Sequence, residues 1–190
     1  MKRTRIAIDA IAAWDNLALA AWKAGRGKRQ RPEVADFFSD LDANLKCLGE
    51  AIREGRAPFG KYKSFTIHDP KRRLIHAACF EDRVLHHAIM NLAGPVFETA
   101  MAPTSYACLT GRGVHAVSGR VLAAMRRYPW YVKIDITNYF ATLSHERLWL
   151  LLKRRFKGDE FLELLLRIIQ GCESGAWRRR ELLHYPSIEV

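Results

Sequence analysis

The chain has 190 residues, 49% of them hydrophobic and 27% charged, with 7 prolines and 12 glycines. This length suffices for one domain or two packed subdomains, and the composition excludes disordered, collagen-like and low-complexity proteins. The formal net charge of +11 predicts a polyanionic partner such as nucleic acid, with a generally basic soluble protein as the plain alternative. The basic residues form clusters suited to a phosphate backbone: Lys2, Arg3 and Arg5; Arg26, Lys28, Arg29 and Arg31; Lys71, Arg72 and Arg73; Lys153, Arg154, Arg155 and Lys157.

The cysteines and the N-terminal stretch bear on the cellular compartment. An apolar stretch near the N-terminus is interrupted by Asp9, Asp15 and Asn16, which disfavours both an export signal and a membrane span. We expect an amphipathic helix there, a cytoplasmic protein and no membrane partner. The four cysteines are too far apart to form zinc-ligating pairs, so we expect them to be reduced and mostly buried: Cys47, Cys79, Cys108 and Cys172.

The first half of the chain predicts helices around a hairpin. Pro32 opens a helix with an apolar stripe that ends near Gly55. The segments YKSFTI and RLIHAA flank the turn-like residues 68–71 and predict a β-hairpin with a basic tip. A further helical face follows from Phe80 to Leu92, and the pair Gly94-Pro95 is expected to break it.

The second half predicts one strand between helices. A loop from Ser105 to Gly113 leads into a helix whose apolar residues are expected to face inward: Val114, Val117, Val121, Leu122 and Met125. The segment WYVKIDI alternates, so a strand would place Trp130, Val132, Ile134 and Ile136 on one side and Tyr131, Lys133 and Asp135 on the other. Ser144 is a suitable N-cap for one helix, and Asp159 begins another.

Three blocks follow one another along the chain: FTIHDPKRRLIHAACFEDRVLHHAIMNLAGPVFE, SYACLTGRGVHAV and KIDITNYFATLSHERL. They resemble segments of reverse transcriptases, in the order in which that family carries them. The likeness is greatest to the bacterial enzymes of diversity-generating retroelements, in GKRQRPEVADFF, SFTIHDPKRRLI, EDRVLHHAI and SYACLTGRG. It extends from Gly25 to Gly171. A group II intron reverse transcriptase is the alternative within the class.

The resemblance implies a mostly helical α+β chain, with the fingers and part of the palm of a right-hand polymerase and an incomplete antiparallel palm sheet. The expected regions are an N-terminal helix and basic linker over 1–31, fingers over 32–128, a partial palm over 129–172 and a divergent tail over 173–190. Two other interpretations stay open: a non-catalytic RNA-binding module derived from a polymerase, and a basic helical protein with accidental motif matches.

Site residues follow from the same resemblance. Asp135 would be catalytic and hold Mg²⁺ with the backbone carbonyl of Ile136. Asn138 and Tyr139 would offer backbone N–H groups to a triphosphate, and Phe140 would exclude a ribose 2′ hydroxyl, with ordinary core packing as its alternative. The basic positions divide between two ligands. Lys71 and Arg73 would grip the incoming deoxynucleoside triphosphate, whereas nucleic-acid contacts are expected at Arg29, Arg31, Arg72 and Arg112. If the likeness is accidental, the hairpin tip is only a solvated turn.

The implied partners are template RNA, a primer or cDNA strand, and a small basic accessory protein of the retroelement. The sequence lacks two segments that the resemblance leads us to expect: a serine-glutamine segment, and a tyrosine-x-Asp-Asp hairpin that supplies the further carboxylates in this family. The only aspartate after Asp135 is Asp159. We expect a frameshift, a truncated gene or a gene-model fragment, with a split enzyme completed by a second chain as the alternative.

The single carboxylate of Asp135 generates a first prediction. A two-metal polymerase site with one carboxylate binds magnesium weakly and does not hold the triphosphate in line. We expect no extended product when this chain alone is given an RNA template, a primer, magnesium and four deoxynucleotides. Robust extension that Asp135→Ala abolishes would contradict this expectation.

Overall fold

The computed structural model describes residues 2–68, 72–107, 109, 111–137 and 139–171, without the side chains of residues 73, 140 and 141. Over these residues the chain is mostly helical with two small sheets, in agreement with the expected α+β class. The elements follow in this order: β1 (Thr4–Arg5), α1 (Ile8–Ile11), α2 (Trp14–Gly25), α3 (Pro32–Ser39), α4 (Leu41–Arg53), β2 (Tyr62–His68), β3 (Arg72–Ala78), α5 (Phe80–Ala100), α6 (Val114–Arg127), α7 (Tyr139–Thr142), α8 (His145–Arg155), β4 (Phe156–Lys157) and α9 (Asp159–Gly171).

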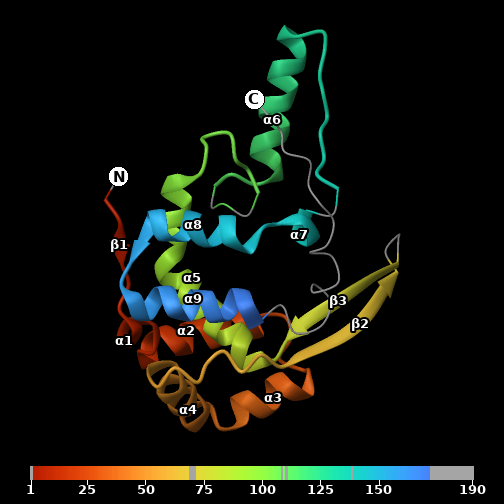
Figure 1. Cartoon of the computed structure of the whole chain (residues 1–190). Coiled ribbons are helices and arrows are strands. Elements are labelled where there is room, and N and C mark those ends of the chain that lie inside the picture. Colours follow the sequence, from red (N-terminus) through yellow and green to blue (C-terminus); the bar gives the residue numbers. More distant parts are fainter. Residues whose placement is uncertain (1, 69–71, 108, 110, 138, 172–190) are drawn as a thin grey trace. The chain divides into compact units, whose positions relative to one another are not determined.

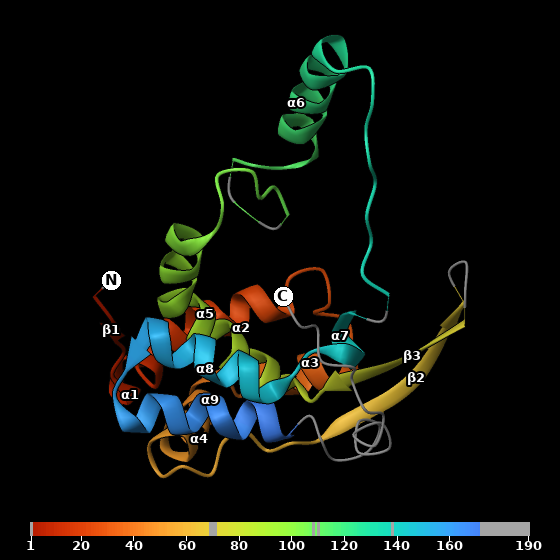
Figure 2. The same cartoon turned by 45° about the horizontal axis from the view of Figure 1, so that its top comes forward.

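The chain divides into two compact units. Unit 1 combines Met1–Ala93 with Ser144–Val190, and unit 2 is the stretch between them, Gly94–Leu143. Among the described residues, the buried hydrophobic side chains all belong to unit 1. Figures 1 and 2 show how α1 to α4, α8, α9 and the first part of α5 surround this core. No described helix combines the length and the apolar character that crossing a lipid bilayer requires.

The N-terminal stretch forms a short strand and two helices instead of the single expected helix. The break falls at Ala13, whose backbone is extended with φ −64° and ψ 138°. The side-chain amide of Asn16 donates hydrogen bonds to the carbonyl oxygens of Ile11 at 3.0 Å and Ala88 at 3.2 Å. Such side-chain bonds to the backbone compete with continuation of a helix. The apolar periodicity does not predict this break between α1 and α2, because the break involves a hydrogen bond to Ala88 in α5, which is far away in the sequence.

The helix expected from Pro32 to Gly55 is also two helices, α3 and α4. Asp40 separates them with φ −132° and ψ 64°, which are not helical values. Two side chains take the place of helical partners for carbonyls at the end of α3. Ser39 Oγ donates to the Asp36 oxygen at 2.7 Å, and Asn44 Nδ2 donates to the Phe37 oxygen at 3.1 Å. The apolar stripe continues across the bend, so its spacing alone did not reveal it.

β2 and β3 form the antiparallel hairpin that the sequence predicts. Tyr62 is opposite Ala78 at the base, and His68 is opposite Arg72 at the far end. The expected turn, 69–71, lies outside the described residues. Figure 1 shows the two strands as a ribbon that extends away from the helices of unit 1.

A buried carboxylate joins the base of this hairpin to α5. Asp82 is 0% exposed, and its two side-chain oxygens accept the backbone N–H groups of Phe59 at 2.8 Å and Gly60 at 2.9 Å. Gly60 has φ +66°, a conformation that favours glycine. Beside it, the N–H of Cys79 donates to the carbonyl of Lys61 at 2.8 Å. Hydrogen bonds to a charged acceptor are among the stronger ones in proteins, so the loop before β2 is fixed against the start of α5.

The two ends of unit 1 meet in a short parallel sheet. β1 pairs with β4, so that Thr4 is opposite Phe156 and Arg5 is opposite Lys157. Phe156 is 0% exposed and packs edge to face with Phe161, with ring centroids 5.3 Å apart. This aromatic pair places the C-terminal helices and the N-terminal strand in one core.

The capping predictions for α8 and α9 are confirmed. Ser144 Oγ accepts the backbone N–H of Arg147 at 3.2 Å, Glu146 lies in the first turn, and basic residues occupy the last turn of α8. α9 begins at Asp159. The acidic residue at the start of α8 and the basic residues at its end both interact favourably with the helix dipole.

α5 does not stop at Gly94-Pro95, which corrects the expected break. The helix continues to Ala100 with Pro95 inside it. A proline removes one backbone hydrogen bond, and buried residues such as Leu85 and Ile89 hold the preceding turns in place. The change of packing still falls at this point, because the last buried side chain of α5 belongs to Ala93 and unit 2 starts at Gly94.

α6 of unit 2 has the expected position but not the expected burial. None of its side chains is buried, and Val114, Leu122 and Met125 are 76%, 59% and 60% exposed. The prediction that its apolar face points inward is wrong for the described residues. The periodicity alone does not say whether a neighbour is present to cover such a face.

The expected strand from Trp130 to Ile136 is not formed. Residues 131–136 carry no regular secondary structure, and Val132 and Ile134 are each 84% exposed. A strand is stabilised by hydrogen bonds to a neighbouring strand, and among the described residues no strand pairs with this segment. The alternating pattern therefore does not produce a strand here, because it has no neighbouring strand. The described residues contain no antiparallel palm sheet.

The Asp82 anchor gives a stability prediction. Asp82→Asn leaves one acceptor for two N–H donors and places an amide N–H against the second donor. An unsatisfied buried donor costs about 1–3 kcal/mol, so we expect the free energy of unfolding to fall by about 2–3 kcal/mol in urea titrations. Asp36→Asn, at an exposed position of α3, is the matched control and should change stability by less than about 0.5 kcal/mol. Equal effects of the two substitutions would show that the anchor contributes nothing special.

Candidate nucleic-acid interface

The hairpin presents exposed apolar residues together with basic ones. Phe65 is 48% exposed and Leu74 is 59% exposed, although both are in strands. Arg72, a predicted nucleic-acid contact, is exposed opposite His68 at the far end of the ribbon. Towards the base, Ser64 Oγ and His76 Nδ1 are hydrogen bonded across the strands at 2.7 Å. Aromatic and aliphatic side chains near cations suit both bases and phosphates of a nucleic acid.

The other predicted hairpin residues are only partly described. Lys71 lies outside the described residues. Arg73 is described by its backbone, which pairs with Ile67 in the ladder. Their expected contacts with a triphosphate therefore stay predictions.

Two predicted nucleic-acid contacts lie in the link between α2 and α3. Arg29 is exposed, and its guanidinium group lies over the ring of Phe38 at 4.7 Å from the centroid. Arg31 is exposed, and its carbonyl oxygen accepts the N–H of Ala35 at 2.9 Å in the first turn of α3. Stacking on an aromatic ring orients a guanidinium without neutralising its charge. Arg29 is thus held at the surface with its charge available.

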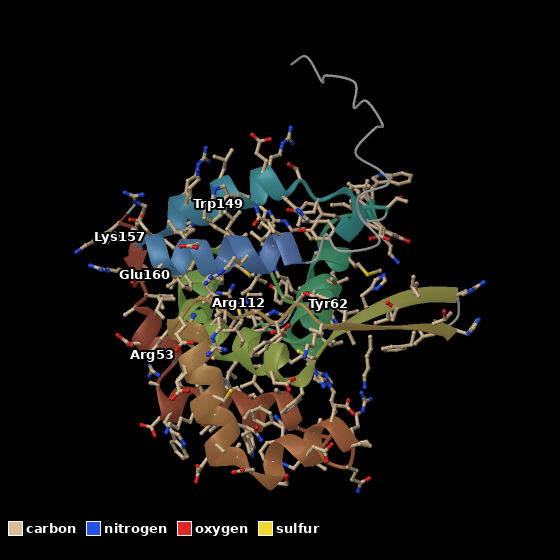
Figure 3. The ribbon with its side chains drawn as sticks, turned by 60° about the horizontal axis from the view of Figure 1, so that its bottom comes forward. Arg53, Tyr62, Arg112, Trp149, Lys157 and Glu160 are labelled. Carbon is tan, nitrogen blue, oxygen red and sulfur yellow. The ribbon has the colours of Figure 1, made fainter. Side chains whose placement is uncertain are left out.

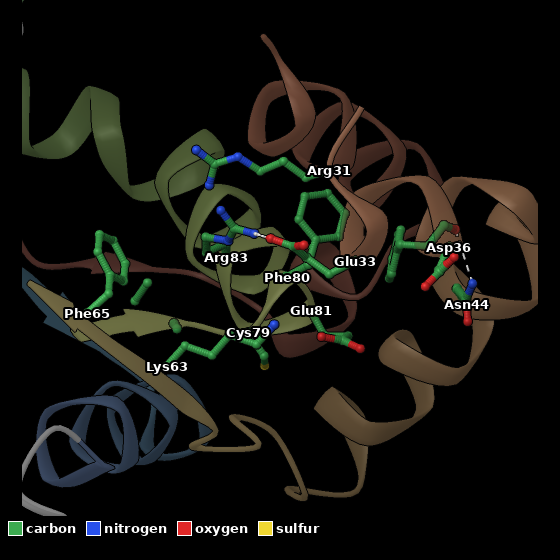
Figure 4. Close-up of a pocket in the computed structure, with 13 residues that line it drawn as sticks. Arg31, Glu33, Asp36, Asn44, Lys63, Phe65, Cys79, Phe80, Glu81 and Arg83 are labelled. Carbon is green, nitrogen blue, oxygen red and sulfur yellow. Dashed lines mark hydrogen bonds and ion pairs between the residues drawn. The ribbon is translucent and has the colours of Figure 1, made fainter. Parts of the chain in front are cut away.

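A cavity of about 530 Å³ is lined by residues of α3, of the base of the hairpin and of the start of α5. Cations, carboxylates and aromatic rings all contribute to its wall, as Figure 4 shows. The structure brings Arg31 and Lys63 into this one wall from separate segments. Its lining consists of Arg31, Glu33, Asp36, Phe37, Asn44, Lys63, Phe65, Ala77, Ala78, Cys79, Phe80, Glu81 and Arg83.

Arg83 links the sides of this cavity. Its Nη2 is 3.7 Å from a carboxylate oxygen of Glu33, and its guanidinium lies over the ring of Phe80 at 5.2 Å from the centroid. Its Nε atom is buried and has no hydrogen-bond partner among the described residues. The arginine therefore joins α5 to α3 and retains an unsatisfied donor.

The two described cysteines differ in environment. Cys47 is exposed, which corrects the expectation of burial for this residue, whereas Cys79 is half-buried. Burial raises the pKa of the Cys79 thiol to about 12, and the charges of Asp82 and Glu81 act in the same direction. Cys79 is therefore an inert thiol of the cavity wall. Cys108 and Cys172 lie outside the described residues.

The Asp135 segment belongs to unit 2. Asp135 is exposed, and its carboxylate has no hydrogen bond or ion pair with a described residue. Ile136 follows it and is 61% exposed, and Tyr139 is the first residue of α7. Asn138 lies outside the described residues, and only the backbone of Phe140 is described, within α7. No group of three His, Cys, Asp or Glu side chains is placed to hold a metal ion in the part of the chain that the structure describes.

Arg112 has a structural role inside unit 2. Its side chain is half-buried, and Nη1 donates to the carbonyl oxygen of Ala102 at 3.3 Å. Nearby, Arg120 Nη1 donates to the hydroxyl oxygen of Tyr106 at 3.2 Å. These bonds order the loop before α6. The expected contact of Arg112 with a template strand stays a prediction.

Sequence reasoning missed Asp82 and Arg83 as residues that shape this region. Asp82 falls on the same helical face as Leu85 and Ile89, which are buried. A carboxylate on a buried apolar stripe is unusual, since a charge there needs hydrogen-bond partners. The helical periodicity of EDRVLHHAI already places Asp82 on the apolar face, so the sequence alone could have indicated a buried, hydrogen-bonded carboxylate.

Comparison with known proteins gives limited matches. No protein-family profile matches the sequence. Nuclear intron maturase 2, mitochondrial, of Arabidopsis thaliana is 26% identical over 110 residues, which cover 50% of this chain and 15% of the maturase. Protein YkfC of Escherichia coli K12 is 26% identical over 106 residues, which cover 53% of this chain and 28% of YkfC. The chain is thus similar to an intron maturase over half its length, and it matches less than a third of either relative.

The environment of Cys79 gives a reactivity prediction. A thiol with a pKa near 12 has almost no thiolate at pH 8, so we expect iodoacetamide to modify Cys79 at least about 100-fold more slowly than the exposed Cys47. Peptide mass spectrometry resolves the two sites, and Cys47→Ser identifies the fast one. The rate at Cys79 should rise as the pH increases towards 10. Equal rates at pH 8 would contradict the burial of this thiol.

Proposed function

We propose that this chain is a nucleotide- and RNA-handling part of a reverse transcriptase, an RNA-directed DNA polymerase. The observation that carries the proposal is the similarity to an intron maturase, a class related to reverse transcriptases, over half of the chain. The net charge of +11 and the exposed basic residues Arg29, Arg31 and Arg72 support it, because they suit a phosphate backbone.

The proposed metal site centres on Asp135. Mg²⁺ usually keeps several waters and is bound through one or two carboxylates together with substrate phosphates. An exposed carboxylate without a described partner fits one such position, and the carbonyl of Ile136 would be the next ligand. When bound, the metal ions would activate the primer hydroxyl and offset charge on the triphosphate. One carboxylate fits weak metal binding that depends on the nucleotide.

The remaining proposed roles concern the incoming deoxynucleoside triphosphate. Lys71 and Arg73 would contact its phosphates, because a guanidinium fork and an ammonium suit phosphate oxygens. Asn138 and Tyr139 would donate backbone N–H groups, and Phe140 would exclude a 2′ hydroxyl. Each role comes from the resemblance of the two blocks that contain these residues.

Two subclasses share this proposed activity. The sequence blocks resemble diversity-generating retroelement enzymes, for which template RNA, a cDNA primer and a small basic accessory protein would be partners. The similarity to an intron maturase favours a group II intron type. Both would copy RNA into DNA, so the proposed chemistry does not depend on the choice.

A non-catalytic RNA-binding module is the second candidate function. It is favoured by the lack, among the described residues, of any cluster of three acidic, histidine or cysteine side chains around a metal site. Both candidates bind RNA with a strong dependence on salt, since lysines and arginines release counterions from phosphates. Nucleotide binding separates them.

The discriminating measurement is magnesium-dependent binding of a deoxynucleoside triphosphate by calorimetry. We expect Asp135→Asn to weaken it about tenfold or more, equivalent to ~1.4 kcal/mol, because the substitution removes the proposed metal ligand. Asp159→Asn, at an exposed position in the first turn of α9, is the matched control and should have no effect. Wild-type protein that binds RNA but no nucleotide would favour the non-catalytic module.

A further inference from the structure

The fold brings together two basic clusters that are far apart in the sequence. β1 carries Arg5 and β4 carries Lys157, and the parallel pairing places these two residues directly opposite each other. The flanking cations come from the N-terminus before β1 and from the last turn of α8. We define the β1–β4 surface by its exposed basic residues Lys2, Arg3, Arg5, Lys153, Arg154 and Lys157.

Backbone geometry holds the centre of this surface. Gly158, next to Lys157, has φ +106°, and a Cβ added to it would lie 3.6 Å from Cγ of Arg5. The apolar stem of Arg5 therefore packs along the turn into α9, while the residue stays exposed. Lys153 lies over the ring of Trp149, 5.5 Å from its centroid. Figure 3 labels Trp149, Lys157 and Glu160 on this part of unit 1.

The charges of the β1–β4 surface are not neutralised within the protein. Among the described residues, no carboxylate forms an ion pair with any of its six cations. Within four positions of these cations in the sequence, the acidic residues are Asp9, which pairs with Arg53, and Asp159 and Glu160 in the first turn of α9. Six cations against these three carboxylates leave a positive field, which attracts a polyanion.

We propose that the β1–β4 surface is a second RNA-binding site, which contacts the phosphate backbone independently of the bases. The choice of RNA rests on the proposed function. The surface and the far end of the hairpin lie at opposite ends of unit 1 (Figures 1 and 2). A single long RNA can contact both ends, whereas a flat lipid surface does not wrap around a compact unit. The site shares no residue with the Asp135 segment or the hairpin.

The test compares RNA affinity and its salt dependence in matched variants. Arg5→Gln with Lys157→Gln removes two proposed phosphate contacts, so we expect the slope of log affinity against log salt to decrease by about 2 and the affinity to fall several-fold. Lys46→Gln with Arg56→Gln removes the same charge from exposed positions elsewhere in unit 1 and should leave the slope almost unchanged. A third variant, Lys153→Gln with Arg154→Gln, leaves the strand pair intact and should behave like the first.

The outcomes separate this inference from the proposed function. If both surface variants match the Lys46 and Arg56 control, the β1–β4 surface does not bind RNA, whatever Asp135 does. If the surface variants lose affinity while no magnesium-dependent nucleotide binding occurs, the second site stands and the polymerase proposal fails. The last measurement is binding of the wild type and the surface variants to vesicles with 30% phosphatidylserine. Binding to vesicles that the surface variants lose, with RNA binding unchanged, would assign the surface to a membrane and overturn the inference.

Discussion

The buried carboxylate of Asp82 is the interaction on which the arrangement of unit 1 around the hairpin depends. A charge without solvent exposure is stable only when its oxygens are fully hydrogen bonded, and here two consecutive N–H groups of the loop before β2 satisfy it. These bonds fix the position of the loop, and β2 begins directly after it. Asp82 fixes the hairpin base to α5, and the ion pair of Arg83 with Glu33 links α5 to α3 beside the cavity. The β2–β3 hairpin is exposed over most of its length, and Asp82 fixes the position of its base.

The distribution of ion pairs explains why so much positive charge remains for a partner. The described ion pairs engage Arg53, Arg56 and Arg83, which lie outside the four basic clusters. Among the described residues of these clusters, Arg26 lies over Trp22, Arg29 lies over Phe38, and the stem of Arg5 packs along Gly158. Such contacts restrict a side chain without reducing its charge, which lowers the entropic cost of binding a phosphate.

Local signals in the sequence were sufficient for part of this fold. The hairpin, the Ser144 cap and the starts of α8 and α9 depend on neighbouring residues, and they were predicted correctly. The bends at Ala13 and Asp40 were not predicted, because the apolar pattern continues across both of them. The bends depend on side-chain hydrogen bonds to the backbone. The strand at Trp130–Ile136 failed for another reason, since alternation predicts a strand only where a partner strand exists. For the site, Asp135 and Arg72 are exposed and their roles stay predictions. The role of Arg112 within its own loop and the anchor at Asp82 needed the structure.

The pairing of β1 with β4 has a consequence for biosynthesis. Thr4 leaves the ribosome first, but its partner Phe156 is translated only after the whole of unit 2. Until then the N-terminal strand has no ladder partner, and the core residues around Phe156 and Phe161 are missing. Unit 1 therefore completes its folding late, by closing a loop that contains unit 2, and such closure is slower than local folding. A nascent chain arrested before α8 would expose the apolar face that Phe156 covers and would be a natural substrate for chaperones.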